Sequence, residues 1–555
     1  MNTLSNIFKH PFSTQRLFST ARKITNPPAR VAVPHSGYAA LSAIKDLKLS
    51  NVPTTLITHT PPPKDWGCDY QLLTGDSVLA SYNNLEKIGT EIDKYNQKNP
   101  SDPITALHPK YGFQSENPQY HDLCDSLGIT FIGPNRESME LGNKARLREA
   151  LLQAGLAVNP GQALSGSEEQ KLDQARAFMS KWGDAVVKIA SGGGGRGIYF
   201  VSNPEDLSNI LKSAESAGAA TGESELLIES WRKHFRHLEA QALCSETQKH
   251  VVSWRDCSVQ KNLQKRLEYT LPPELEPYRD ELTLEVEQFL ISNNYIGPGT
   301  IELAFMIDPK TKEPKDIKMI NQSGDVVLKK WWWIEINVRT QVEKPVTELE
   351  TGISLESLLI QNLILGQPLP ESYLRENHVI HERLVLDRAH PLGYTHLTGL
   401  DTSQLPRSSS VRIAMNTPLS GDLDLQFGRL VTTYPINQKD PQASWEKTVD
   451  LAKEAHYKLQ MWGPQFREES VVENFFDMGL DKNLKGGPKA LEASNDVLGP
   501  PTTDLIDTIR PILGRQKKPA KLQEAVRQLA TRVANPEKTL PGYVSKSNKT
   551  DKPGG

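Results

Sequence analysis

The stretch from Trp331 to Leu355, WWWIEINVRTQVEKPVTELETGISL, constrains the fold more than any other part of the sequence. Its first residues are apolar and β-prone, so a core strand is expected. Because side chains alternate across a strand, Glu335 and Asn337 share one face. A carboxylate beside an amide oxygen suits Mg²⁺ held against a polyphosphate. An isolated E-x-N more often marks the solvated face of an edge strand. Here the polar residues, Arg339 among them, cluster directly after a tryptophan-rich strand, which favours a site.

The same stretch resembles the biotin carboxylase signature E-x-N-x-R-x-Q-V-E-H-P-V-T-E-x-x-T-G. Every defining position matches except the family histidine, which is Lys344 here. The resemblance extends over about residues 31–464. It implies an ATP-grasp protein that makes carboxyphosphate from ATP and bicarbonate and then carboxylates biotin. The implied fold is α/β and α+β, with a Rossmann-like pre-ATP-grasp domain over 30–143, an ATP-grasp domain over 144–366 and a biotin carboxylase C-terminal domain over 375–475.

Composition agrees with a multidomain protein and excludes some partners. A chain of 555 residues is expected to form several domains, and 37% hydrophobic residues suffice for real cores. A net charge of −3 argues against a nucleic-acid partner. No run approaches the roughly 20 apolar residues that span a bilayer, so no membrane partner is expected. Four widely spaced cysteines form no metal pattern and suggest a reducing compartment.

The two ends of the chain differ from the rest. Residues 1–29 are rich in Ser and Thr and carry several Lys and Arg, and the first acidic residue is Asp46. This composition predicts a mitochondrial transit peptide and location in the matrix. The alternative is a disordered basic N-terminus without an address. Residues 476–555 fall outside the resemblance and are expected to hold one amphipathic helix, KLQEAVRQLATRVANP, and a disordered end.

The first domain begins with a βαβ pattern. RVAV and TTLITH read as strands around the helix AALSAIKDLKL, which implies parallel pairing. The opening turn keeps Gly37 but lacks the acid of the family's Gly-Glu-Ile-Ala turn. Further on, ALHPKYGFQSENPQY resembles A-x-H-P-G-Y-G-F-L-S-E-N-P, with Lys110 in place of a glycine.

A glycine-rich loop in DAVVKIASGGGGRGIYFV is the expected phosphate cover. It follows a strand that carries Lys188, and backbone N–H groups of Gly193, Gly194 and Gly195 can close on phosphate oxygens. The loop is not a Walker A motif, because it joins strand to strand and lacks G-K-[ST]. A flexible linker would lie between domains rather than between two apolar strands. The resemblance adds Lys144, at a helix start, as a second lysine that reaches ATP phosphate.

Further nucleotide contacts are implied by the resemblance alone. Glu229 would accept from the base or ribose, and His237, in RHLEAQ, would face the nucleotide. In WRDCSVQKNLQKRLEY the family's Gln260 and Lys265 are kept, whereas Leu263 stands at the position of a histidine. Lys265 is a compact cation suited to bicarbonate and to the transferring phosphoryl group.

The metal is expected between two strands. Glu302 lies at the centre of GPGTIELAFM, and a buried acid needs a partner, for which a metal is suited. Glu302, Glu335 and Asn337 are therefore predicted to hold two Mg²⁺, with Mn²⁺ as an alternative ion. Residues 307–330 between these strands read as a long surface hairpin.

The remaining implied roles concern bicarbonate and biotin. Glu343 would act as general base and Arg383 would contact the ureido oxygen of biotin. Near Arg383, His381 replaces a family glutamate, and later Asp424 is kept where the neighbouring tyrosines are not. The residues that would hold bicarbonate are Lys265, Arg339, Gln341 and Val342.

Two functions remain open. No A-M-K-M biotinylation sequence occurs, so biotin is expected on a separate carrier protein, with a carboxyltransferase subunit in trans and a homodimer as the resemblance implies. The first hypothesis is a biotin carboxylase serving a mitochondrial acyl-CoA or pyruvate carboxylase, favoured by the retained charged residues. The second is a catalytically degenerate ATP-grasp protein with a structural or regulatory role in a mitochondrial assembly, favoured by Leu263 and the altered C-terminal domain.

Overall fold

A computed structural model describes the chain within residues 30–462. The predictions for residues 1–29, for Gly193, Gly194 and Gly195, for Leu263, for Asp424 and for residues 476–555 lie outside the described residues. The gaps inside the described range are residues 60, 63–65, 76, 78–79, 112, 191–196, 220–224, 262–263, 312, 386–395, 398, 402, 407–409, 416–420 and 423–425.

The N-terminal unit is a parallel sheet with helices packed on it. Its strand order is β3-β2-β1-β4-β5, and all four pairings are parallel, as the βαβ pattern predicted. Apolar residues of β1 and α1, such as Val31, Val33 and Leu47, are buried. The elements are β1 (Arg30–Pro34), α1 (Gly37–Leu49), β2 (Thr54–Thr58), β3 (Tyr70–Leu73), α2 (Leu85–Lys98), β4 (Ile104–Leu107), α3 (Pro118–Leu127), β5 (Thr130–Phe131) and α4 (Arg136–Glu140).

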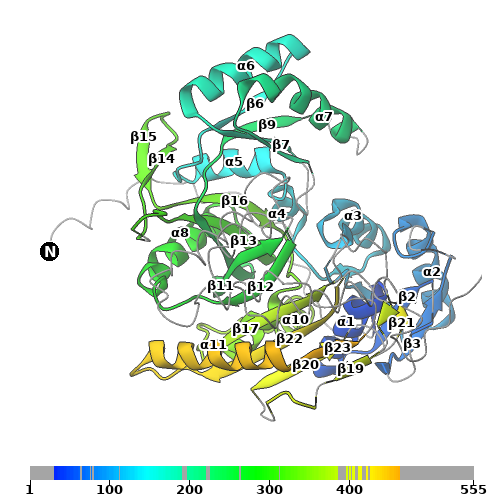
Figure 1. Ribbon diagram of the computed structural model, residues 1–555. Coiled ribbons are helices and arrows are strands. Elements are labelled where there is room, and N and C mark those ends of the chain that lie inside the picture. The colour runs from blue at the N-terminus through cyan, green and yellow to red at the C-terminus, as the bar shows by residue number, and fades with distance from the viewer. Residues whose placement is uncertain are drawn as a thin grey trace, which may run out of the picture.

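A small antiparallel sheet forms the next unit, seen at the top of Figure 1. Its strand order is β6-β9-β7-β8, with α6 and α7 packed on it through buried residues such as Phe178 and Leu211. Helix α6 starts with a capping box, in which Ser167 and Gln170 exchange hydrogen bonds. The elements are α5 (Lys144–Gln153), β6 (Gly161–Leu164), α6 (Glu168–Trp182), β7 (Ala185–Ile189), β8 (Ile198–Val201), α7 (Leu207–Ala219) and β9 (Leu226–Ser230).

The largest unit is an eight-stranded sheet in the order β16-β13-β10-β11-β12-β17-β22-β20. Strand β17, in the predicted C-terminal domain, pairs directly with β12, so one sheet runs across the predicted boundary. The predicted α/β and α+β fold class is confirmed. The strands are β10 (Phe235–Cys244), β11 (Lys249–Lys261), β12 (Gln264–Thr270), β13 (Gly297–Met306), β16 (Trp331–Asn337), β17 (Asn377–Val385), β20 (Val411–Met415) and β22 (Gln426–Pro435).

In the described part of the chain, further helices pack on the large sheet or, for α10, on α1 of the N-terminal unit. Helices α9 and α10 follow β16, and α11 packs along β17 and β22 at the bottom of Figure 1. Helix α10 ends at Leu363. The helices are α8 (Arg279–Ser292), α9 (Lys344–Thr351), α10 (Leu355–Leu363) and α11 (Pro441–Lys458). Short strands are β18 (His396–Leu397), β19 (Gly399–Asp401), β21 (Gly421–Asp422) and β23 (Gln460–Trp462).

The tryptophan-rich strand β16 is buried on both faces. Trp331 and Trp333 point to one side, where both indole N–H groups donate to Glu285 Oε1 of α8, at 2.9 and 3.0 Å. Trp332 points to the other side and packs edge-on against Phe235. Each buried indole is therefore packed, and two of the three also gain a hydrogen bond.

The hairpin predicted over residues 307–330 is present. It pairs β14 (Ile317–Ile320) with β15 (Val326–Lys329), and its Met319 side chain is buried in a cluster with Phe235 and Trp332. Within the described residues, no helix combines the length and apolar character that a membrane span requires.

Candidate functional site

One face of the large sheet carries a row of polar side chains. The register places Glu239 of β10 opposite Glu302 of β13, and Glu302 opposite Glu335 of β16. One step further along, Thr300 lies opposite Asn337. Because side chains alternate along each strand, the same strands turn apolar residues to the opposite face, where the core lies. The antiparallel ladder thus assembles the polar face from separate parts of the chain.

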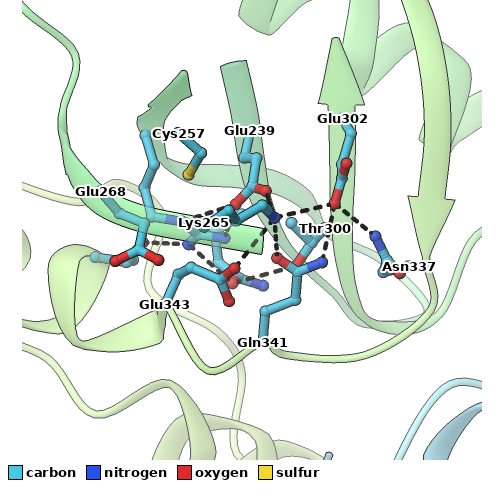
Figure 2. A network of polar contacts seen from close by, with 12 residues as sticks. Glu239, Cys257, Lys265, Glu268, Thr300, Glu302, Asn337, Gln341 and Glu343 are labelled. Atoms are coloured by element: carbon cyan, nitrogen blue, oxygen red, sulfur yellow. Dashed lines mark hydrogen bonds and ion pairs between the residues drawn. The ribbon is translucent and has the colours of Figure 1, made fainter. Parts of the chain in front are cut away.

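Lys265 is at the centre of this face (Figure 2). Its Nζ lies 3.2 Å from Glu302 Oε1, 3.1 Å from Glu343 Oε1 and 3.4 Å from Gln341 Oε1, and it also pairs with Glu239. These partners come from β10, β13 and the segment before α9. A single ammonium group therefore connects the predicted metal, bicarbonate and base residues.

Lys265 and its carboxylate partners keep one another in the charged form. Burial alone lowers the pKa of Lys265, but the carboxylates of Glu239 and Glu302 outweigh it and hold the pKa well above its ordinary value. Burial alone raises the pKa of Glu302, but Lys265 and His237 outweigh it and hold that pKa well below its usual range. The site is a network of charged groups at neutral pH.

His237 and Gln260 lie beside this network. His237 Nε2 is 2.8 Å from Glu302 Oε2, and Gln260 Nε2 donates to His237 Nδ1 at 3.0 Å. Because the amide nitrogen of Gln260 can only donate, Nδ1 accepts, and the proton of the neutral ring is on Nε2, which faces Glu302 Oε2. Burial lowers the pKa of His237, but Glu302 outweighs it, so the pKa is raised.

The predicted metal ligands lie together where the C-terminal end of β16 runs beside the middle of β13. Asn337 Nδ2 donates to Glu302 Oε1 at 2.9 Å and to Glu335 Oε1 at 3.5 Å, and Lys144 Nζ lies 2.9 Å from Glu335 Oε2. These are hard oxygen donors that suit Mg²⁺ or Mn²⁺. A neighbouring group, His237, Glu239 and Glu302, has its ligand atoms within 4.8 Å of one another.

Glu239 was missed by the sequence reasoning. It lies two residues after His237 in RHLEAQ, so the strand period already placed it on the same face. Arg255 was also missed: its Nη2 lies 3.1 Å from Glu239 Oε2, and its Nη1 donates to Thr347 Oγ1 at 2.8 Å. Nothing local in the sequence marks Arg255, because its partners lie on β10 and α9.

Glu343, which contacts Lys265, also forms an ion pair with Arg383. Arg383 also pairs with Glu268, whose Oε2 lies 2.8 Å from His381 Nδ1. Burial raises the pKa of Glu343, but the charges of Arg383 and Lys265 outweigh it and hold the pKa below its ordinary value. The proposed base and the proposed biotin contact are therefore neighbours.

Three of the residues predicted to hold bicarbonate, Arg339, Gln341 and Val342, lie on the segment between β16 and α9 that ends in Glu343. Arg339 lies 3.2 Å from Glu116 Oε1 through Nε, and its Nη2 donates to Asn337 Oδ1 at 3.5 Å. Gln341 donates to Glu302 Oε1 at 3.1 Å, and Val342 is in the turn that leads to α9. The guanidinium of Arg339 is held by a single carboxylate, Glu116, among the described residues.

The two predicted phosphate lysines lie on different elements. Lys188 Nζ of β7 is 2.7 Å from Glu229 Oε2 of β9. Burial raises the pKa of Glu229, but Lys188 outweighs it, so the pKa is lowered. Lys144 starts α5, and its backbone N–H donates to the carbonyl of Ala190, next to the glycine loop, at 3.2 Å. Lys144 thus joins the small sheet to the Glu335 carboxylate of β16.

A parallel βαβ unit, a small antiparallel sheet and a large antiparallel sheet with facing lysines and carboxylates define the ATP-grasp class of protein. Residues 28–139 match the model of the biotin carboxylase N-terminal domain. Residues 143–372 match that of the ATP-binding domain of the carbamoyl-phosphate synthase L chain. The chain belongs to the biotin carboxylase family.

Two relatives illustrate the similarity. Biotin carboxylase of Nostoc sp. is 33% identical over 271 residues, which is 47% of this chain and 54% of the relative. Chloroplastic biotin carboxylase 1 of Populus trichocarpa is 31% identical over 350 residues, 60% of this chain and 61% of the relative. The chain thus spans about half of the length of the first of these relatives and about three-fifths of the second.

Solved structures share the fold. The biotin carboxylase domain of Hydrogenobacter thermophilus 2-oxoglutarate carboxylase, solved with MgADP, ADP and bicarbonate, superposes with a TM-score of 0.67 at 24% identity. The superposition covers 85% of this chain and 99% of that one. Biotin carboxylase of Campylobacter jejuni gives a TM-score of 0.66 at 24% identity and covers 87% and 98%.

Proposed function

We propose that this protein is a biotin carboxylase, which uses ATP and bicarbonate to carboxylate biotin on a separate carrier. The observation that carries the proposal is the convergence on Lys265. One ammonium group contacts the predicted metal ligand Glu302, the bicarbonate residue Gln341 and the base Glu343, and Arg383 pairs with that base. A protein with only a structural role has no physical need for this arrangement.

In the first half-reaction, an oxygen of bicarbonate bonds to the γ-phosphorus of ATP and the bond to ADP breaks, which gives carboxyphosphate. Lys265 and Arg339 hold the bicarbonate anion, and Glu343 takes its proton. Mg²⁺, held by Glu302, Glu335 and Asn337, would supply charge neutralisation of the phosphates. Lys188 contributes a further positive charge to the γ-phosphoryl group.

The low pKa of Glu343 is compatible with this role. Glu343 pairs with Lys265 and Arg383, and the proposed bicarbonate site lies beside the same two cations. A bicarbonate anion beside these cations competes for their charge, which raises the proton affinity of Glu343 when substrate is present. Carboxyphosphate then splits into CO₂ and phosphate. The phosphate takes the N–H proton of the ureido group of biotin, and the nitrogen bonds to CO₂ beside Arg383, away from water.

The test is steady-state ADP release at saturating Mg·ATP, with bicarbonate and free biotin added separately. We expect bicarbonate to stimulate turnover in the wild type. Glu343→Gln should lower this turnover by about 10²-fold, the usual effect of losing a positioned base, and leave Mg·ATP binding almost unchanged. A wild-type protein that binds Mg·ATP but releases ADP at one background rate under all conditions rejects the proposal and leaves an ATP-grasp protein kept for assembly.

The setting of the reaction is part of the proposal. We propose a mitochondrial enzyme that acts as a homodimer with a biotin carrier or carboxyltransferase subunit of an acyl-CoA or pyruvate carboxylase. The basic, acid-free residues 1–29 support the location. Mass spectrometry of the protein isolated from mitochondria should find this segment removed, and an intact Met1 on a cytosolic protein contradicts the location.

A further inference from the structure

Two lysines that depart from the biotin carboxylase motifs meet in the structure. Lys110 stands where the motif has glycine, and Lys344 where it has histidine. Lys110 Nζ lies 2.7 Å from Asp46 Oδ2, and Lys344 Nζ lies 3.5 Å from the same oxygen. Asp46 belongs to α1 of the N-terminal unit. Two lysines that are far apart in the sequence, and that both depart from the motifs, therefore contact the same carboxylate, that of Asp46.

Each lysine also has a second carboxylate. Lys110 Nζ is 3.1 Å from Glu356 Oε1 of α10, and Lys344 Nζ is 2.6 Å from Glu348 Oε1 of α9. The result is an alternating chain of charges, Glu356–Lys110–Asp46–Lys344–Glu348, which is called here the lysine clasp. It joins α1 and the segment after β4 to α9 and α10.

The environment of the clasp makes its members depend on one another. The Lys110 side chain is 0% exposed and that of Lys344 is 7% exposed, so each charge needs its partners. The backbone of Lys110 has φ of 63°, a left-handed conformation that strains a residue with a Cβ. A glycine would adopt this φ without strain, so the ammonium group is what the lysine adds.

The lysine clasp adjoins the proposed base in the chain. Lys344 is the first residue of α9, and Glu343 is the residue before it. The Glu343 carboxylate pairs with Lys265 and Arg383 of the large sheet. The next residue, Lys344, forms an ion pair with Asp46 of the N-terminal unit. The backbone at the start of α9 is therefore held from two sides.

We infer that Lys110 and Lys344 are positioning residues that fix the start of α9, and with it Glu343, against the N-terminal unit. The inference rests on the proposed function, because Glu343 is the base of that reaction. Both lysines contact carboxylates of the chain itself, Asp46, Glu356 and Glu348. Their effect is on the placement of Glu343, and a misplaced base lowers turnover without weakening the binding of Mg·ATP.

The experiment uses the full chain and two clasp variants, the first of which is charge-balanced. Lys344→Met/Glu348→Gln removes one cation together with one of its acids, so no buried acid is left without a charge partner. Lys110→Gly removes the ammonium group and relieves the strained backbone. The matched control is Lys171→Met/Glu215→Gln, which removes a lysine–glutamate pair at 2.6 Å between α6 and α7.

Three quantities are measured: the Kd of Mg·ATP, bicarbonate-dependent ADP release, and amide hydrogen exchange of the peptide spanning residues 339–352. Both clasp variants should keep the Kd within about twofold. They should lower turnover by about 10- to 100-fold, as expected for a displaced base. Exchange in the peptide should become about tenfold faster. The control should change none of the three.

Three results overturn the inference. The first is unchanged exchange in the peptide, and the second is faster exchange with turnover within about twofold of wild type. A fall in turnover that appears only together with weaker Mg·ATP binding also overturns it. If the wild type shows no bicarbonate-dependent turnover, the proposed function is rejected. Faster exchange confined to residues 339–352 then still supports the clasp as the element that fixes α9.

Discussion

Lys265→Met should destabilise the large sheet strongly, because it removes the positive charge shared by three buried carboxylates. Glu239 keeps Arg255 and Glu343 keeps Arg383, whereas Glu302 is left with the His237 ring at 2.8 Å. Breaking a buried ion pair by removing one partner costs about 3–5 kcal/mol, and we expect a loss in this range at neutral pH.

The pH dependence of this loss has a defined sign. In the wild type, the pKa values of Glu302 and Glu343 are lowered in the folded state. They therefore contribute stability that is present above the unfolded pKa of about 4.3 and is lost as pH falls through the folded pKa. Without Lys265, burial raises the pKa of Glu302, and the folded state then loses stability as pH rises.

The measurement is urea unfolding followed by tryptophan fluorescence at pH 5 and pH 7.5. Trp254, Trp331 and Trp333 lie in the core of the large sheet and report on its unfolding. The difference between wild type and Lys265→Met should grow from pH 5 to pH 7.5. Lys171→Met, which breaks a partly exposed pair, should cost less than about 1 kcal/mol. A deficit for Lys265→Met below that value, or one no larger at pH 7.5 than at pH 5, refutes the reasoning.

Two further predictions concern the nucleotide and a second buried acid. Lys188→Met should weaken Mg·ATP binding at least tenfold by calorimetry, which is about 1.4 kcal/mol. The control is Lys212→Met, which removes an ion pair with Glu168 at 3.0 Å and should leave the affinity unchanged. Equal affinities of wild type and Lys188→Met would show that Lys188 is not part of the site. Burial raises the pKa of Glu274 to about 7, so its ionisation costs stability as pH rises from about 4.5 through 7. Glu274→Gln should therefore raise the urea midpoint at pH 8 but not at pH 5, and an equal change at both pH values contradicts this.

The sequence by itself determined the kinds of element and the faces they present. The βαβ start, the strand with Lys188, the hairpin within residues 307–330 and the tryptophan-rich strand all follow from local apolar periodicity and turn residues. The signature motif indicated the family, because its residue types and spacing are specific to it. Period-two alternation was enough to place Glu335 and Asn337 on one face of their strand.

Only the tertiary structure decided which charges meet. Periodicity gives the face of a side chain but not its partner, because antiparallel register joins strands far apart in the sequence. Glu239 thus came to lie opposite Glu302, and Arg383 was brought to Glu343 by a C-terminal strand that joins the large sheet. In the sequence, Lys110 and Lys344 are two separate departures from a motif. In the folded chain both must be neutralised in the same buried space, so a single carboxylate on α1 connects them.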